Sequence, residues 1–334
     1  MKPTIYDVAE KAGVSISTVS KVLNNTGSLA DKTRKKVKET MQELNYQPSV
    51  AASVKKRIQM IGLLIPNIAN PFMAEVARSI ENHLKRHGYS LMICSTDNDF
   101  KNEIEYISIL KQKYTEGIIV ATGLKKEKSI KELVKTNLPV ALLSRDVPSL
   151  AIDTVLVDDY LGGYEATRHL IELGHEKIAM ITEDTTFSII QSRVLGYKKA
   201  LEEAGLNYDE SLVLTNNTSL DEGKKSMLTL LKKSSPPTGI FASTETLAIG
   251  ALQGARELNI KVPDELSIVG FDDTVLSTIC DPPLTTIAQP IEEMGKKVVE
   301  LLVEEIEKKK ESKQRVILSP KLIVRNSTAK KKIF

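Results

Sequence analysis

The chain has 334 residues, with 46 Lys and Arg against 43 Asp and Glu, no Trp, and two cysteines, Cys94 and Cys280. This length is enough for two or three hydrophobic cores, and two cysteines cannot form a disulfide framework. No apolar run approaches the length of a membrane span. Because the N-terminus has no apolar signal region, we expect a cytoplasmic protein that contacts no membrane.

Positive charge is concentrated near the N-terminus. Residues 1–57 contain eleven Lys and Arg and five Asp and Glu, a net charge of +6, whereas the remainder carries −3. Such a basic segment indicates either a polyanion partner or a solvated, charged helix face. Charge alone leaves both interpretations open. The scarcity of aromatic residues argues against a stacking platform for single-stranded nucleic acid.

Residues 1–47, which we call the head, have the pattern of a helix-turn-helix. An apolar stripe at helical spacing is formed by Ile5, Val8, Ala9 and Ala12. Thr4 and Asp7 have the spacing of a capping box, and Gly13 supplies a turn. Ser15 can cap a second helix. The inward-facing residues of the second and third helices would be Val19, Val22, Leu23, Val37, Met41 and Leu44. Three short helices with a basic outer face favour duplex DNA as the polyanion.

Residues 48–58, the hinge, contain small residues that cannot bury a core by themselves. We expect a linker, or a helix that forms only against a partner. Residues 59–330, the body, alternate short apolar runs with amphipathic stretches. The predicted strands are Ile61–Ile65, Leu91–Cys94, Gly117–Ala121, Val140–Leu143, Ile178–Ile181, Gly239–Ala242 and Ser267–Gly270. Helices are predicted near residues 71–87, 101–113, 161–173, 188–204, 220–233, 244–258 and 291–311.

This alternation is typical of parallel sheets covered by helices on both faces. A single sheet with so many strands would be large, so we expect two α/β lobes. A ligand cleft would then lie at the carboxyl ends of the strands. The sequence contains no Walker loop, no dinucleotide glycine fingerprint and no pairing of a nucleophile with a base. We therefore expect no enzyme activity, no cofactor and no metal site.

Several spaced motifs run from the head to the end of the body. They are Thr4–Ala9, Gly13–Ser15, Thr18–Asn24, Leu44–Pro48, Ile65–Phe72, Gly162–Tyr164, His169–His175, Arg193–Tyr197, Val269–Asp273 and Pro283–Ile287. Through them, nearly the whole chain resembles the lactose/galactose repressor (LacI/GalR) family of bacterial transcription regulators. The resemblance implies an all-α helix-turn-helix head and an α/β body of two doubly wound parallel sheets, like a type I periplasmic sugar-binding protein. The N-lobe would span about residues 59–158 and 288–318, and the C-lobe about 159–287 and 319–330.

A recognition helix reads base edges with residues near its N-terminus, here Ile16, Ser17, Ser20 and Lys21. Ile16 can only pack on a thymine methyl or exclude other bases, and Lys21 can donate to guanine without the fork of an arginine. The resemblance assigns phosphate contacts to Thr4, Ser15, Thr18, Asn24 and Tyr46. The alternative for Ser15 is a pure helix cap, and for Tyr46 a packing role at a helix end.

The hinge of the family folds on the operator and wedges a leucine into the minor groove, which kinks the DNA. We assign this minor-groove contact to Ala51 and Val54. Val54 is the closest candidate for the wedge, but valine reaches less far than leucine and favours strands. The alternative is an ordinary linker residue.

Asp272 and Asp273 directly follow a predicted buried strand. Their spacing alone leaves open a helix cap, an acid/base pair, a metal site or acceptors for sugar hydroxyls. The resemblance assigns the effector to Asp272, Phe72 and Arg193, where the alternatives are core packing for Phe72 and a surface ion pair for Arg193. Further candidates for effector binding, each near the carboxyl end of a strand, are Arg145 and Thr244. Two arginines would suit an acidic effector such as a sugar acid or sugar phosphate.

The head pattern predicts a DNA-binding transcription regulator, and the family resemblance implies a homodimer that binds palindromic double-stranded DNA. We expect a repressor of carbohydrate or sugar-acid genes, whose operator affinity is controlled by a small effector in the cleft. Such an effector must bind the two states of the protein unequally, and the coupling must be reciprocal. The alternative is a global regulator of the carbon-catabolite type, controlled by a protein partner.

Overall fold

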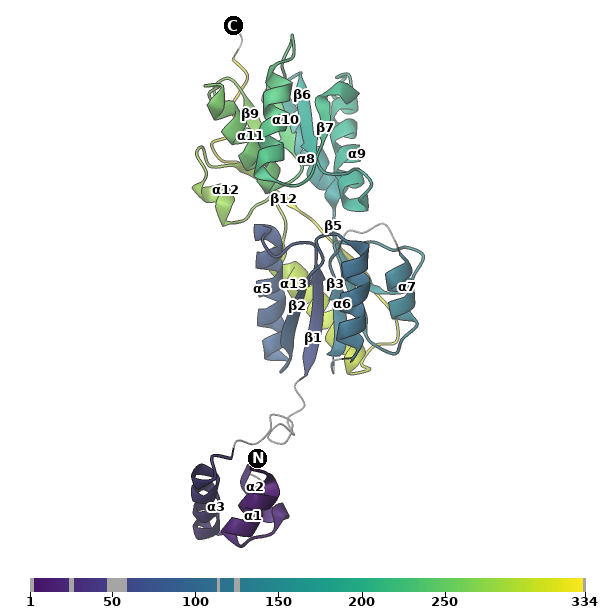
Figure 1. The fold of residues 1–334 in the computed structure, drawn as a ribbon. Coiled ribbons are helices and arrows are strands. Elements are labelled where there is room, and N and C mark those ends of the chain that lie inside the picture. Colours follow the sequence, from purple (N-terminus) through teal and green to yellow (C-terminus); the bar gives the residue numbers. More distant parts are fainter. Residues whose placement is uncertain (1–2, 24–26, 47–58, 113–114, 123–126, 333–334) are drawn as a thin grey trace. The chain divides into compact units, whose positions relative to one another are not determined.

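The computed structural model describes residues 3–23, 27–46, 59–112, 115–122 and 127–332. The chain divides into two compact units, Met1–Gln59 and Met60–Phe334, and each has its own hydrophobic core (Figure 1). Within these ranges, no helix combines the length and the apolar character that crossing a membrane requires.

The head is formed by three helices, α1 (Ile5–Ala12), α2 (Ile16–Leu23) and α3 (Asp31–Glu43). Its core consists of Val8, Ala9, Ala12, Val19, Val22 and Val37, with Ile5, Leu23, Met41, Leu44 and Tyr46 packed around it. The spacing of apolar residues therefore identified the inward faces correctly. The predicted helix-turn-helix is confirmed.

The ends of α1 and α2 are fixed by local hydrogen bonds. The hydroxyl of Thr4 accepts from the backbone N–H of Asp7 at 3.4 Å, and the carboxylate of Asp7 accepts from the N–H of Thr4 at 2.6 Å. These bonds complete the predicted capping box, and the hydrogen bond from the Thr4 side chain lowers the pKa of Asp7. Gly13 ends α1 at φ 64°, a left-handed conformation that glycine adopts freely. The hydroxyl of Ser15 accepts from the N–H of Thr18 at 3.2 Å at the start of α2.

The N-lobe of the body is built on a six-stranded parallel sheet, in the order β11-β5-β4-β3-β1-β2. Its strands are β1 (Met60–Ile65), β2 (Ser90–Ser95), β3 (Thr115–Val120), β4 (Val140–Leu143), β5 (Asp153–Val157) and β11 (Arg315–Leu318). One face is covered by α5 (Pro71–Arg86) and α13 (Ile291–Ile306), and the other by α6 (Phe100–Gln112) and α7 (Lys128–Val134) (Figure 1).

The C-lobe has a second six-stranded sheet, in the order β12-β10-β9-β8-β6-β7. Its strands are β6 (Ile178–Thr182), β7 (Val213–Thr215), β8 (Gly239–Ala242), β9 (Ser267–Asp272), β10 (Thr285–Ala288) and β12 (Lys321–Ile323). This sheet is parallel except for the edge strand β12, which pairs antiparallel with β10. The faces are covered by α8 (Asp159–Glu172) with α9 (Ser188–Glu203), and by α10 (Leu220–Leu231) with α11 (Glu245–Glu257). Two short helices, η1 (Glu210–Leu212) and α12 (Val275–Ile279), complete the lobe.

The chain passes between the lobes after β5, after β10 and after β11. In each sheet the first strand lies inside: β1 separates β3 from β2, and β6 separates β8 from β7. The strand order therefore reverses at β1 and at β6. In open α/β sheets, the carboxyl ends beside such a reversal form a crevice where ligands bind.

Candidate functional site

A cavity of about 490 Å³ lies between the carboxyl ends of the two sheets of the body. Its wall includes Asn67 after β1, Ala121 after β3, Glu183 after β6 and Thr244 after β8. The order of the sheets reverses at β1 and β6, and β3 and β8 are their neighbours, so the cavity occupies the position expected for a ligand. Within the described ranges, no group of His, Cys, Asp and Glu could hold a metal ion.

Several loops that form the wall turn through left-handed backbone conformations. Asp97 and Asn98 follow β2 at φ 52° and 53°, Ser144 follows β4 at φ 52°, and Asp272 ends β9 at φ 104°. Residues other than glycine rarely adopt these conformations. They persist where the surrounding structure enforces them, and they are concentrated at binding sites.

Asp272 is a buried wall residue with two internal partners. Its Oδ1 accepts from Nε2 of Gln289 at 2.7 Å, and its Oδ2 accepts from the backbone N–H of Glu245 at 3.3 Å. Burial raises the pKa of the Asp272 carboxyl, while the nearby Arg193 opposes that rise. The carboxylate is thus held in a fixed position at the cavity, where its remaining lone pairs can accept hydrogen bonds from a ligand.

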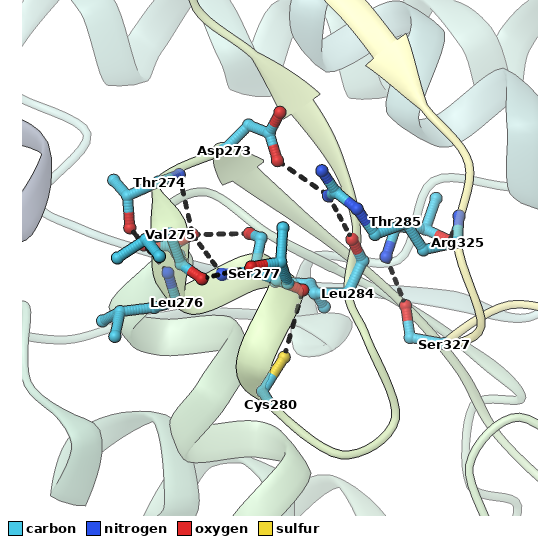
Figure 2. Close-up of polar contacts among 12 residues, drawn as sticks. Asp273, Thr274, Val275, Leu276, Ser277, Cys280, Leu284, Thr285, Arg325 and Ser327 are labelled. Carbon is cyan, nitrogen blue, oxygen red and sulfur yellow. Dashed lines mark hydrogen bonds and ion pairs between the residues drawn. The ribbon is translucent and has the colours of Figure 1, made fainter.

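Asp273 has a different role from its neighbour. It lies at φ 65°, and its Oδ1 forms an ion pair with Nη1 of Arg325 at 2.7 Å (Figure 2). The cap of α12 is Thr274, whose hydroxyl accepts from the N–H of Leu276 at 3.2 Å. The two carboxylates therefore form neither a helix cap nor an acid/base pair.

Arg193 enters the wall from α9 as part of a buried ion pair. Its Nε and Nη2 each lie 2.7 Å from Oδ1 of Asp159, and its Nη1 donates to the carbonyl oxygen of Ser243 at 2.5 Å. The guanidinium carbon lies 3.5 Å from the centroid of the Phe271 ring, a cation–π geometry. Burial raises the pKa of Asp159, and Arg193 counteracts that shift. The predicted surface alternative for Arg193 does not apply, because its side chain is only 4% exposed.

Phe72 and Thr244 also line the cavity. Phe72 is buried in the N-lobe core near the start of α5, and its N–H donates to Oδ1 of Asn70 at 3.0 Å. Thr244 caps α11, and its hydroxyl accepts from the N–H of Leu247 at 3.3 Å. Both residues therefore combine a structural role with exposure to the cavity.

Arg145 does not line the cavity, which corrects the prediction that it contributes to effector binding. Its Nη1 donates to Oε2 of Glu103 at 3.0 Å and to the hydroxyl of Thr122 at 2.9 Å, inside the N-lobe. Ser129 also donates to the Glu103 carboxylate. Arg145 therefore balances the charge of a fully buried glutamate, and its neighbour Ser144 is the residue that reaches the wall.

Glu183 is a wall residue that the sequence-based prediction missed. It follows β6 directly, and it makes no hydrogen bond or ion pair with any residue that the structure describes. Burial, with a smaller contribution from the charge of Asp272, raises its pKa to about 7, although Arg193 opposes this rise. The sequence signal that could have identified Glu183 was its position, two residues after the predicted strand Ile178–Ile181. Gln289, which follows β10, was missed as well.

In the head, the four predicted base readers lie along α2. Ile16, Ser17 and Lys21 are exposed, and Ser20 is half-buried. Ile16 is 42% exposed, so its side chain is accessible for contact with a partner.

The predicted phosphate-binding residues differ in their local roles. Thr4 is exposed and takes part in the capping box, and Thr18 is half-buried. The hydroxyl of Ser15 lies 2.8 Å from that of Ser17, in addition to capping α2. Tyr46 packs against the core of the head, as its alternative role required. Asn24, Ala51 and Val54 lie outside the described residues.

Comparisons with known proteins agree with these observations. The pattern of "Bacterial regulatory proteins, lacI family" matches residues 4–49, and that of "Periplasmic binding protein-like domain" matches residues 167–328. The HTH-type transcriptional regulator DegA of Bacillus subtilis (strain 168) is 48% identical over 334 residues, which cover 98% of this chain and 99% of the relative.

Two solved structures show the same architecture. A LacI family regulator from Enterococcus faecium with bound ribose is 32% identical, with a TM-score of 0.76 over 82% of this chain and 100% of the other. The lac repressor dimer bound to operator and the anti-inducer ONPF is 25% identical, with a TM-score of 0.82 over 98% of this chain and 100% of the other. The chain therefore belongs to the LacI family of DNA-binding transcriptional regulators, which are not enzymes, and it carries the family's periplasmic-binding-protein-like effector domain.

Proposed function

We propose that this protein is a homodimeric, cytoplasmic repressor of carbohydrate genes, and that a small hydroxylated effector in the cavity controls its affinity for a palindromic operator. The main support for this proposal is the position of the cavity, which lies where the strand order reverses in both lobes. A ligand there contacts both lobes at once. It therefore binds different lobe arrangements with different affinity, which is the thermodynamic requirement for control of the operator.

The charges of the wall argue against the sugar acid or sugar phosphate that the sequence suggested. That idea required two arginines, and Arg145 lies elsewhere. Arg193 is the sole cation among the described wall residues, and Asp159 already balances its charge. The polar groups that remain, such as Asp272, Thr244 and Gln289, suit hydroxyl groups.

The operator test uses the full-length protein and double-stranded DNA selected from random palindromes. We expect a selected palindrome to bind with an affinity that falls steeply with salt, because the basic head displaces counterions from phosphates. Sedimentation of the complex should give two chains per palindrome. An affinity that does not depend on salt, or one chain per site, would contradict the proposal. If only a partner protein, and no small molecule, changed the operator affinity, the carbon-catabolite alternative would replace it.

Lys21→Ala should weaken specific binding by about 30-fold or more, because one base contact is worth about 1–3 kcal/mol and the dimer loses it in both half-sites. Lys21 is exposed on the outer face of α2. Its loss should relax selectivity at one base position. Lys32→Ala removes the same charge from α3 and serves as the matched control. That control should weaken binding equally for all sequences, so a Lys21→Ala variant with unchanged sequence preference would refute the base-reading role.

Asp272→Asn should weaken effector binding by about 10- to 100-fold, since hydrogen bonds to a charged group are worth about 1.5–3 kcal/mol. Asparagine tolerates the positive φ of this position and preserves the volume of the side chain. Isothermal titration with the effector found by screening measures the loss. Asp273→Asn is the control, because that carboxylate pairs with Arg325 instead of facing the cavity. Equal affinities in the two variants would remove Asp272 from the site.

A further inference from the structure

The charged residues of the cavity wall are unbalanced. Among the described lining residues, three carry carboxylates, Asp97, Glu183 and Asp272, and one carries a cation, Arg193. Arg193 lies 2.7 Å from Asp159, so its charge is matched by a fourth carboxylate behind the wall. The cavity therefore has an excess of negative charge, which repels an anionic ligand and attracts a cationic one.

Glu183 and Asp272 differ in the hydrogen-bond donors that contact their carboxylates. The carboxylate of Asp272 accepts from Gln289 and from the N–H of Glu245. Glu183 has no such donor in the part of the chain that the structure describes, although it sits at the inner strand β6 and faces the cavity. The side chain of Glu183 is half-buried, and its carboxylate oxygens are available to accept hydrogen bonds from a ligand in the cavity. A ligand that occupies the cavity is in position to supply the missing donor.

The raised pKa of Glu183 fits a carboxyl group that has no cation paired with it in the described part of the protein. The charged groups that shift the pKa of Glu183 are Arg193, which lowers it, and Asp272, which raises it. Burial is the largest influence, and the result is a pKa of about 7. A positive group beside Glu183 would reverse this shift, because an opposite charge favours the ionised carboxylate.

We propose that Glu183 determines the specificity of the effector cavity by selecting ligands that carry a protonated amine in addition to hydroxyl groups. The amine would lie against Glu183, and the hydroxyls would face Asp272, Thr244 and Gln289. This inference rests on the proposed function, since it takes the cavity as the effector site. It narrows the effector from hydroxylated compounds in general to amino sugars and related amino polyols.

The test uses matched compounds that differ only at carbon 6 of glucose, galactose and mannose. For each sugar, the neutral hexose, the 6-amino-6-deoxyhexose and the hexuronate are titrated into the full-length protein by calorimetry. We expect the amine to bind roughly tenfold or more tightly than the neutral sugar, and the acid to bind more weakly than both. Operator affinity is measured with the same compounds.

The outcomes separate this inference from the proposed function. If neutral sugars or hexuronates bind as tightly as the amines and change operator affinity, the amine preference is wrong and the effector cavity stands. If no compound of any class binds or changes operator affinity, the effector proposal fails and the preference fails with it.

Glu183→Gln provides a readout that a purely structural role would not give. In this variant the amine should bind no better than the neutral hexose, whereas affinity for the neutral hexose should change by less than about threefold. Glu210→Gln removes an exposed charge of the same lobe and should preserve the preference.

The pH dependence gives a second readout. Because a bound amine lowers the pKa of Glu183, binding releases a proton, and wild-type affinity for the amine should rise from about pH 6 to about pH 8. The rise should be absent in Glu183→Gln. A preference for the amine that survives this substitution would overturn the assignment to Glu183.

Discussion

Gly196→Ala is expected to lower the free energy of unfolding by about 3 kcal/mol or more, because it places a methyl group where two helix backbones touch. A Cβ at Gly196 would lie 2.1 Å from the carbonyl oxygen of Tyr160 and 2.6 Å from the backbone nitrogen of Tyr164. A Cβ at Gly163 would similarly lie 2.1 Å from the carbonyl oxygen of Arg193. These atoms belong to the backbones of α8 and α9, so neither contact can be relieved by rotation of a side chain.

Urea unfolding measures this effect through the midpoint of the transition. Leu195→Ala is the control, since that neighbouring side chain is 50% exposed and its loss should cost under about 1 kcal/mol. The close contact also sets Arg193 of α9 against Asp159 of α8. Any folded fraction of Gly196→Ala should therefore bind the effector more weakly. A stability within about 0.5 kcal/mol of wild type would show that the helices can separate without penalty.

Every predicted strand is present, because each is a short continuous apolar run that could be recognised locally. Strand β5 was missed, since it begins with the fully buried Asp153. Lys310 and Lys313 balance that carboxylate, and both are more than 150 positions away. A local pattern cannot reveal such a distant partner.

Strand β10, which lies between β12 and β9, was missed for a related reason. Strand β10 contains consecutive threonines, and its backbone and side chains bond to the C-terminal segment: the N–H of Thr285 donates to the Ser327 hydroxyl at 2.8 Å (Figure 2). Its hydroxyl also lies 3.0 Å from that of Thr328. These partners are about 40 residues away in the sequence. The residues of β10 by themselves therefore indicate neither its strand structure nor its burial.

The site was predicted in position but not in side-chain direction. Phe72, Arg193 and Asp272, which the resemblance assigned to the effector, and Thr244, a further candidate, all line the cavity. The expectation that residues just after a strand line the cavity was wrong for Arg145. Successive side chains near the end of a strand point to opposite sides, so only some of them face the cavity. The ion pair between Arg145 and Glu103 is evident only in the structure. Glu183 meets the same expectation, but no family motif singled it out.

Arg193→Leu should lower the free energy of unfolding by about 3–5 kcal/mol, because it leaves the carboxylate of Asp159 buried without its cation. Asp159 would also lose its hydrogen bonds from Nε and Nη2, and the carbonyl of Ser243 would lose its donor. Asp159→Asn in the same chain should recover part of the loss, since the neutral amide carries no uncompensated charge. A double-mutant cycle then gives the coupling of the pair.

The pH dependence of Arg193→Leu follows from the same ion pair. Burial already raises the pKa of Asp159 above its usual 3.8, and Arg193 is the group that limits the rise. Without that arginine, the folded state holds a proton that the unfolded state releases. Stability of the variant should therefore fall as pH increases through the raised pKa, so its deficit relative to wild type is larger at about pH 8 than at about pH 5.

The pKa of Glu183 should rise as well in Arg193→Leu, because Arg193 lowers it in the wild type, and this shift has the same sign. Arg193 lowers the pKa of Asp272 too, so comparison with Arg193→Leu/Asp159→Asn isolates the part of the deficit that comes from Asp159, while Glu183 and Asp272 account for the remainder. Urea unfolding at both pH values measures each deficit. A deficit in Arg193→Leu that is equal at the two pH values would mean that Asp159 keeps its charge without the arginine, and that the buried pair is not what holds α8 and α9 at the effector cavity.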